Sequence, residues 1–389
     1  MRALHVAQIG FFQDPRRRAP EELLTAWPSL VDVAESASSA GVRTSVVQSS
    51  SLPASLQREG VAYHFLPFGG RSAPIAAASP FAQLVRDLAP DVFHVHGLAF
   101  PRQVRALAAI APTTPIVLQD HADRVPRLWR WPLWRGCSGV ISGVAFCARE
   151  QAAPFARAGL LNPQIAVYQV PESTSRFTPG SQDDARRLMR VSGAPLILWV
   201  GHLNENKDPL TVLEGVSRAA RLLPELTLYC CFGSMPLLRA VERRIASDPM
   251  LRDRVHLLGS VSHDRVELLM RAADLFVLGS HREGSGYSLI EALACGLPPV
   301  VTDIPSFRAL TGGGEVGRLW SCGDARALCE AILNLAGRSS PALRATARAF
   351  FDRELSLAAL GWKLAAMYES AVRRLERQSA GDALAATSP

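Results

Sequence analysis

Two glutamates enclose a glycine-containing turn in the C-terminal half of the sequence. Glu283 and Glu291 are separated by seven residues, which include Gly284 and Gly286. The turn follows an apolar strand and enters an apolar helix, whose N-terminus offers backbone N–H groups and a partial positive charge to an anion such as a diphosphate. Carboxylates accept hydrogen bonds from sugar hydroxyls. Phosphate donors between two hydroxyl acceptors are typical of a nucleotide-sugar site.

A purely structural explanation of the same residues is that Glu283 favours the helix N-terminus and Glu291 lies on a solvated face. The wider stretch from Ala273 to Asp303 favours the functional one, because it resembles family 4 glycosyltransferases, which carry an E-x7-E pattern and have the GT-B fold. The resemblance implies a retaining transferase with Glu291 on the ribose hydroxyls and Glu283 on the donor hexose. The other donor and phosphate ligands that we expect here are Arg282, Gly284, Ser285, Gly286 and Tyr287.

A second polar loop, from Val200 to Asp208, follows another buried strand. Its Lys207 is one of only two lysines among 42 basic residues. The resemblance implies that Lys207 neutralises the departing diphosphate, which is the electrostatic help that such a transferase needs. The family has an arginine where this chain has His202, a weaker and conditional phosphate donor. Either His202 is protonated beside the phosphates or another cation, such as Arg282, compensates.

The N-terminal half contributes further candidates at the ends of its predicted strands. By resemblance, His121 reaches the donor sugar across a cleft, and we group it with Glu283 and Lys207 as catalytic. Three residues are expected on the acceptor side: Gly10, His96 and Arg16. A structural role for His96 and a solvated basic loop around Arg16 are the alternatives. No second glycine follows Gly10, although the family usually has a glycine-rich loop there, so backbone contacts to phosphate from this loop are not expected.

Tryptophan and arginine alternate between residues 124 and 135. The tryptophans are Trp129, Trp131 and Trp134, and the arginines are Arg124, Arg127, Arg130 and Arg135. This composition suits a membrane interface, where aromatic rings and cations lie at the headgroups. It also suits an acceptor wall that stacks on sugars, or tryptophans packed inward with the arginines outside. Nucleic acid is not an expected partner, because no recognition fold accompanies the charge.

The bulk composition indicates an ordinary two-domain enzyme. The chain has 389 residues, a net charge of +7 and seven cysteines without metal-ligand spacing. Residues 1–178 hold 17 arginines and 12 acidic residues, so +5 of this charge lies in the first half. No apolar run approaches the roughly 18 residues that span a bilayer, and the start does not read as a signal peptide. We expect a cytoplasmic protein, with peripheral contact to the inner face of a membrane through the basic N-terminal domain.

Short apolar strands alternate with amphipathic helices in two successive series, which predicts an α/β protein of two doubly wound, Rossmann-like domains facing a cleft. We place the domains at residues 1–175 and 176–354, with a linker in the polar, turn-rich stretch from Pro171 to Gly180. A C-terminal helix over residues 355–378 is expected to cross back to the first domain, and residues 379–389 to form a frayed tail. The second domain should bind the nucleotide, with base contacts in the range His256–Val261, where Leu258 and Gly259 are the named candidates.

The predicted function is transfer of a hexose from a nucleotide-diphosphate sugar to a hydroxyl of a glycan, a lipid-linked acceptor or a small molecule. We expect no cofactor besides the nucleotide-sugar co-substrate and no metal, since no Asp-x-Asp motif occurs. Two alternatives remain. One is a nucleotide-sugar epimerase or phosphorylase of similar fold. The other is a homologue that binds nucleotide sugars without catalysis, which His202 and the glycine-poor first loop would favour.

Overall fold

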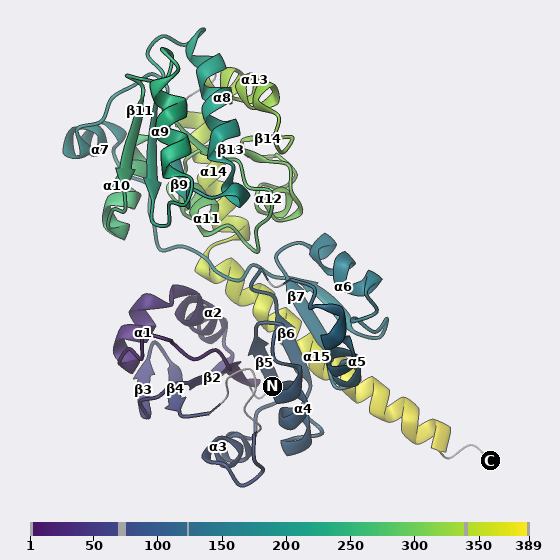
Figure 1. Cartoon of the computed structure of the whole chain (residues 1–389). Coiled ribbons are helices and arrows are strands. Elements are labelled where there is room, and N and C mark those ends of the chain that lie inside the picture. The colour runs from purple at the N-terminus through teal and green to yellow at the C-terminus, as the bar shows by residue number, and fades with distance from the viewer. Residues whose placement is uncertain (1–2, 69–74, 123, 338–340, 387–389) are drawn as a thin grey trace. The chain divides into compact units, whose positions relative to one another are not determined.

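The chain folds into two compact units, and a computed structural model describes residues 3–68, 75–122, 124–337 and 341–386. The first unit comprises residues 1–174 and 357–389, and the second comprises residues 175–356. Each unit is a parallel sheet with helices packed against it (Figure 1). The boundary after residue 174 lies beside the turn-rich stretch in which the sequence predicted a linker.

The first unit contains an eight-stranded sheet in the order β3-β4-β2-β1-β5-β6-β7-β8. Its strands are β1 (His5–Gly10), β2 (Arg43–Ser49), β3 (Ala54–Arg58), β4 (Val61–Leu66), β5 (Val92–His96), β6 (Ile116–Gln119), β7 (Gly143–Phe146) and β8 (Ala166–Gln169). All neighbours pair in parallel except β3 and β4. The central strands β1 and β5 are buried along nearly their whole length, including polar side chains such as Gln8 and His94.

The helices of the first unit are α1 (Pro20–Ala26), α2 (Pro28–Ser39), α3 (Pro80–Leu88), α4 (Pro101–Ile110), α5 (Trp131–Ser138), α6 (Ala153–Arg157) and α15 (Leu357–Ala386), with 3-10 turns η1 (Leu128–Arg130) and η2 (Arg149–Ala152). Proline opens several of them, where its missing N–H costs nothing. α15 returns to this unit from the end of the chain. Its Leu360, Leu364 and Met367 are buried in one core with Val6 and Val92.

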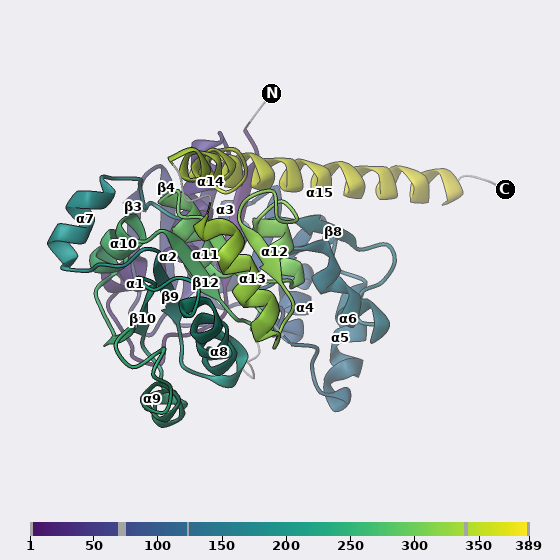
Figure 2. The ribbon, with the colours of Figure 1, turned by 90° about the horizontal axis from the view of Figure 1, so that it is seen from above.

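The predicted C-terminal helix is longer than the sequence analysis expected. Figure 2 shows α15 as one continuous helix, and it extends to Ala386 instead of ending near residue 378. The prediction of a frayed tail from residue 379 is therefore wrong as far as Ala386. Alanine is the strongest helix former, and the run after residue 378 is alanine-rich with no proline before Pro389. Residues 387–389 lie outside the described part.

The sequence analysis also missed the hairpin of β3 and β4. Its connection is Glu59-Gly60, and both residues have positive φ, 48° and 76°. Two consecutive positive φ angles are the geometry of a type I′ turn, which matches the twist of a two-residue hairpin. Asn-Gly or Asp-Gly would have signalled this turn, whereas Glu-Gly does not.

The second unit contains a fully parallel six-stranded sheet in the order β11-β10-β9-β12-β13-β14. Its strands are β9 (Leu196–Gly201), β10 (Thr227–Phe232), β11 (Val255–Gly259), β12 (Leu275–Leu278), β13 (Pro299–Thr302) and β14 (Arg318–Trp320). Its helices are α7 (Gln182–Met189), α8 (Pro209–Ala220), α9 (Leu238–Ala246), α10 (His263–Ala272), α11 (Tyr287–Ala294), α12 (Pro305–Leu310), α13 (Ala325–Ala336) and α14 (Pro341–Glu354), with the 3-10 turn η3 (Glu205–Lys207). Strand order reverses beside β9, which in such sheets marks the ligand end.

Candidate functional site

A pocket of about 290 Å³ lies at this ligand end of the second unit. Five of the residues predicted from the sequence line it together: His202, Lys207, Glu283, Tyr287 and Glu291. The loop after β9 brings the first two, and the turn before α11 and the helix itself bring the other three. Further lining residues that the sequence analysis did not assign include Phe232, Gly233 and Ser288.

Lys207 and Glu283 form an ion pair inside this pocket. The Nζ of Lys207 donates a hydrogen bond to Oε1 of Glu283, and the two side chains are only 15% and 12% exposed. The turn η3 is fixed by Asn204, whose Oδ1 accepts from the backbone N–H of Lys207 at 3.0 Å. Because both charges are partly desolvated, each depends on the other or on a replacement ligand. A diphosphate would offer Lys207 such a replacement.

The turn into α11 depends on the geometry of Gly286. Its φ is 85°, and a Cβ there would lie 2.7 Å from Cε1 of Phe307. Glycine is thus required both for the left-handed backbone and for the space. No side chain in the described part of the chain caps α11 at this end. The helix therefore starts directly at the pocket with its positive dipole end.

His202 contacts the backbone through one of its two ring nitrogens. The N–H of Ser234 donates to Nδ1 of His202 at 3.2 Å. This contact leaves Nε2 as the ring nitrogen that can donate a hydrogen bond to a ligand in the pocket.

Glu291 has a partner that sequence reasoning missed. The Nε2 of His263 lies 2.7 Å from Oε1 of Glu291, and this hydrogen bond raises the pKa of His263 above its ordinary value. The His263 ring also stacks against Phe177, with centroids 4.5 Å apart. No spacing rule connects positions 263 and 291, so nothing in the sequence marks the pair.

The remaining predicted residues of this unit lie around the pocket. Arg282 is exposed, and its carbonyl oxygen accepts from Nδ2 of Asn206 at 2.9 Å. Gly284 and Ser285 are buried within the turn. Within the range predicted for base contacts, Ser260 and Val261 line the pocket, whereas Leu258 and Gly259 are not among the lining residues.

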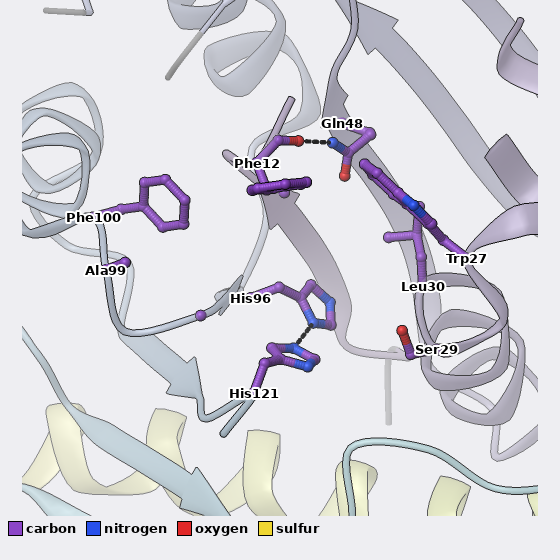
Figure 3. A pocket seen from close by; sticks show the side chains of 11 residues that line it. Phe12, Trp27, Ser29, Leu30, Gln48, His96, Ala99, Phe100 and His121 are labelled. Carbon is purple, nitrogen blue, oxygen red and sulfur yellow. Dashed lines mark hydrogen bonds between the residues drawn. The ribbon is translucent and has the colours of Figure 1, made fainter. Parts of the chain in front are cut away.

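The predicted residues of the first unit gather around a different pocket, of about 340 Å³. It is lined by Gly10, Phe12, Trp27, Ser29, Leu30, Gln48, His96, Gly97, Ala99, Phe100 and His121 (Figure 3). Gly10, His96 and His121 are thus brought together as predicted. Arg16 is exposed on the following loop and does not line the pocket.

His96 and His121 belong to a short hydrogen-bonded chain. Nδ1 of His96 lies 3.1 Å from Nε2 of His121, and Nδ1 of His121 lies 2.6 Å from Oε2 of Glu172. Glu172 is 5% exposed and was not predicted. On the other side, Nε2 of His96 lies 3.3 Å from Oε1 of Gln8. Burial holds the pKa of His96 well below its usual value, which keeps this ring neutral.

The two glutamates, the lysine and the glycine turn all lie in the segment that a known family model matches. Residues 181–347 match the model described as glycosyl transferases group 1. Of the predicted site, this matched segment carries every residue from His202 to Glu291.

Curated relatives agree with this assignment. The chain is 27% identical over 236 residues to GDP-mannose:cellobiosyl-diphosphopolyprenol alpha-mannosyltransferase of Xanthomonas campestris, covering 58% of this chain and 59% of that protein. It is 34% identical over 245 residues to phosphatidyl-myo-inositol mannosyltransferase of Mycobacterium leprae, covering 56% and 63%. The aligned part therefore spans less than two thirds of the length of these relatives.

Solved structures show that the fold extends over nearly the whole chain. A glycosyltransferase from Rickettsia africae covers 96% of this chain and 99% of its own, with a TM-score of 0.69 at 15% identity. Anabaena HepE in complex with UDP and glucose covers 94% and 100%, with a TM-score of 0.65 at 16% identity. The predicted fold of two α/β domains of GT-B type is confirmed.

Two searches of the described residues address membrane spans and metals. No helix in that part of the chain is both long and apolar enough to cross a bilayer. No group of three or more His, Cys, Asp and Glu side chains there is arranged to hold a metal ion. The expected independence of a metal stays a prediction.

Proposed function

We propose that this protein is a glycosyltransferase that moves a hexose from a nucleotide-diphosphate sugar to an acceptor hydroxyl. The observation that carries the proposal is the pocket of the second unit, which places Lys207, Glu283 and Glu291 together at the N-terminus of α11. A cation, a helix dipole and two hydroxyl acceptors are what a nucleotide-diphosphate sugar requires. The match to group 1 glycosyl transferases supports the same conclusion.

In the proposed mechanism, Lys207 exchanges its contact with Glu283 for the diphosphate of the donor. The anomeric C–O bond then breaks while Lys207 and the start of α11 stabilise the charge that develops on the leaving group. Glu283, released from Lys207, accepts hydrogen bonds from the hexose, and Glu291 accepts from the ribose. His202 donates Nε2–H to a phosphate oxygen. The acceptor hydroxyl attacks from the face that the diphosphate leaves and gives its proton to an oxygen of the leaving diphosphate, so the anomeric configuration is retained.

The first experiment is a thermal-shift screen of the whole protein against UDP-, GDP-, ADP- and TDP-sugars. A ligand that binds the folded state raises the melting temperature by mass action, so one base should stand out. Radiolabel from the selected sugar should then appear on an acceptor and not as an epimer or a sugar phosphate, and EDTA should not change the rate. Tight binding without transfer or hydrolysis would favour the non-catalytic alternative.

We also propose peripheral contact with an anionic membrane through the η1 tip, defined as Leu128 and Trp129. Both side chains are 71% exposed. The neighbouring tryptophans differ, because Trp134 is only 2% exposed and Nε1 of Trp131 donates to the carbonyl of Pro126 at 2.9 Å. The alternating pattern in the sequence therefore separates into tryptophans packed against the unit and one exposed pair.

The charge around the η1 tip suits anionic lipid. Residues 124–148 contain four arginines and no acidic residue. The guanidinium of Arg130 lies over the Trp129 ring, 5.8 Å from its centroid. Juxtamembrane arginines contribute about 1 kcal/mol each near an anionic surface, and exposed aromatic groups insert at the interface. The names of the two relatives described above contain diphosphopolyprenol and phosphatidyl-myo-inositol, and both are lipids. These names support the proposal that the protein acts at a lipid surface.

Sedimentation with sucrose-loaded vesicles tests this contact. The wild-type protein should bind vesicles of phosphatidylglycerol and phosphatidylcholine, and bind pure phosphatidylcholine poorly. The double variant Leu128→Ser/Trp129→Ser should lose about tenfold or more in affinity. Trp362→Ser is the matched control, because Trp362 is 69% exposed on α15 of the same unit. If both variants lost the same affinity for vesicles, or if binding did not depend on lipid charge, the η1 tip would be excluded as the contact with an anionic membrane.

A further inference from the structure

The pocket of the first unit lies where a ligand site is expected in a doubly wound sheet. Its lining residues follow the carboxyl ends of β1, β2, β5 and β6. The strand order of the sheet reverses at β1: β2 lies on one side of β1, and the chain continues with β5 on the other side. Ligands bind outside the carboxyl ends of the strands at such a reversal point. The position alone therefore favours a binding role for this pocket.

The walls of this pocket are mainly apolar and partly open to solvent. Phe12, Trp27, Leu30 and Phe100 surround it in Figure 3. The ring of Phe12 is 53% exposed and lies 5.8 Å from the ring of Trp27, whereas Phe100 is only 5% exposed. When an apolar ligand covers an exposed aromatic side chain at the mouth of a cavity, the burial of both surfaces stabilises the complex.

The polar groups of this pocket are already committed to other contacts. The amide of Gln48 crosses over Gly10, where a Cβ would lie 1.9 Å from its Oε1. Its Nε2 donates to the carbonyls of Phe12 at 2.6 Å and Ser49 at 3.0 Å. Gly10 thus has a structural function in this chain, since any side chain there would displace Gln48 from the pocket wall.

The pocket also lacks the charges that would hold an anion. No lysine, arginine, aspartate or glutamate is among its lining residues in the described part of the chain. Its ionisable groups are the imidazoles of His96 and His121. His96 is buried within the histidine chain, and His121 contacts the carboxylate of Glu172, whose negative charge offsets any positive charge on that ring. A phosphate or carboxylate would meet no uncompensated cation here.

We propose that this pocket receives an uncharged aryl or alkyl group that the acceptor carries beside its reacting hydroxyl. The acceptor role rests on the proposed transferase function, whereas the affinity for an uncharged apolar group rests on the lining alone. A volume of about 340 Å³ falls in the range of pockets that bury small organic ligands. The acceptor is then an apolar glycoside or alcohol, and not a sugar phosphate.

Binding of three probes to the full-length protein tests this proposal: phenyl β-D-glucopyranoside, methyl β-D-glucopyranoside and glucose 6-phosphate. Titration calorimetry should give at least tenfold tighter binding of the phenyl glucoside than of the other two. Saturation-transfer NMR should show the strongest saturation on the phenyl protons. Equal affinity of the phenyl and methyl glucosides, or a preference for glucose 6-phosphate, would overturn the proposal.

Substitutions of two side chains with similar exposure test whether the phenyl glucoside binds in this pocket. Phe12→Ser should weaken the phenyl glucoside roughly tenfold and leave the methyl glucoside unchanged. Leu52→Ser is the control, since Leu52 is 45% exposed in the same unit and does not line the pocket. Circular dichroism and the melting temperature would show that both variants fold. Equal effects of the two substitutions on the phenyl glucoside would place its binding elsewhere and reject the pocket.

The nucleotide-sugar screen separates this inference from the proposed function. Stabilisation by a nucleotide sugar without discrimination between the phenyl and methyl glucosides would leave the transferase function intact and refute the apolar acceptor. Binding of the phenyl glucoside that is sensitive to Phe12→Ser, with no response to any nucleotide sugar, would do the opposite. In that case the pocket stands and the donor assignment fails.

Discussion

The two pockets have similar volumes, about 290 and 340 Å³, and opposite chemistry. Both lie at the ligand end of a parallel sheet. The pocket of the second unit holds Lys207, Glu283 and Glu291, whereas the pocket of the first is lined by aromatic and aliphatic groups and neutral polar ones. The same architecture therefore carries a polar pocket, which we propose as the donor site, and an apolar pocket, which we propose for the acceptor. The difference arises in the loops that follow the strands, as expected when a scaffold positions loops that carry function.

The largest effect should come from removing the cation of the polar pocket. Lys207→Ala takes away the charge that we assign to the diphosphate and leaves Glu283 partly buried without that counter-charge. We expect kcat/KM for the nucleotide sugar to fall by about 10²–10³-fold, the usual loss when a group that stabilises developing charge is removed. Steady-state kinetics of transfer or of slow donor hydrolysis would measure it.

The chain offers one matched control for this substitution. Lys363, the only other lysine, lies on α15 in the other unit, and Lys363→Ala should change kcat/KM less than twofold. An unchanged rate for Lys207→Ala, with normal folding, would remove Lys207 from the mechanism. It would also remove the electrostatic contrast between the two pockets.

The next largest effect concerns the backbone that shapes the polar pocket. Gly286→Ala places a Cβ 2.7 Å from Phe307 at a φ of 85°. We expect it to lower the free energy of unfolding of the second unit by about 2–4 kcal/mol, from backbone strain and overpacking together. Urea denaturation followed by the fluorescence of Trp199, buried in the same unit, would measure the change.

A second glycine separates strain from overpacking. Gly323 has a φ of 75°, and a Cβ there would meet nothing within 4 Å. Gly323→Ala should therefore lower the free energy of unfolding only by the backbone strain, about 1–2 kcal/mol. If the two alanine variants lose equal stability, the contact with Phe307 does not constrain the turn, and α11 could start with other residues.

Whether a feature of the candidate site could be predicted from the sequence depends on how far apart its residues lie along the chain. Glu283 and Glu291 belong to one continuous segment, so the resemblance of that segment to a known family marked both residues. Lys207 was found from its own loop, but its ion pair with Glu283 joins residues 76 positions apart and has no sequence signal. Glu172 lies in a polar stretch that predicted only a linker, and its contact with His121 became visible only in the folded chain.

The same limit applies to the secondary structure. The alternation of short apolar strands with helices predicted two α/β series, and the structure has two such units. The β3–β4 hairpin was missed because Glu-Gly is a weak turn signal. The end of α15 was misplaced because the residues after 378 are small and polar, although Gly381 among them does not interrupt the helix. Local chemistry predicts where elements begin, and tertiary packing decides how far they extend.

The smallest expected effect concerns the rim of the polar pocket. Hydrogen bonding to Glu291 raises the pKa of His263 from its ordinary value of 6.5. A raised pKa in the folded state means that the pair stabilises the protein fully below pH 6.5 and loses this contribution as pH rises through the folded-state pKa. The His263 side chain is 63% exposed, so solvent screening limits this contribution to less than about 1 kcal/mol.

Glu291→Gln isolates this effect, because it keeps the shape of the side chain and removes the charge. NMR titration of the His263 ring protons should show its pKa falling back toward the ordinary value. His256 is the internal reference, since it lies in the same unit and its pKa is lowered by burial. A His263 pKa that does not move in Glu291→Gln would mean that Glu291 makes no lasting contact there. Saturating nucleotide sugar should lower the His263 pKa in the wild-type protein as well, because a ribose that occupies Glu291 displaces the histidine.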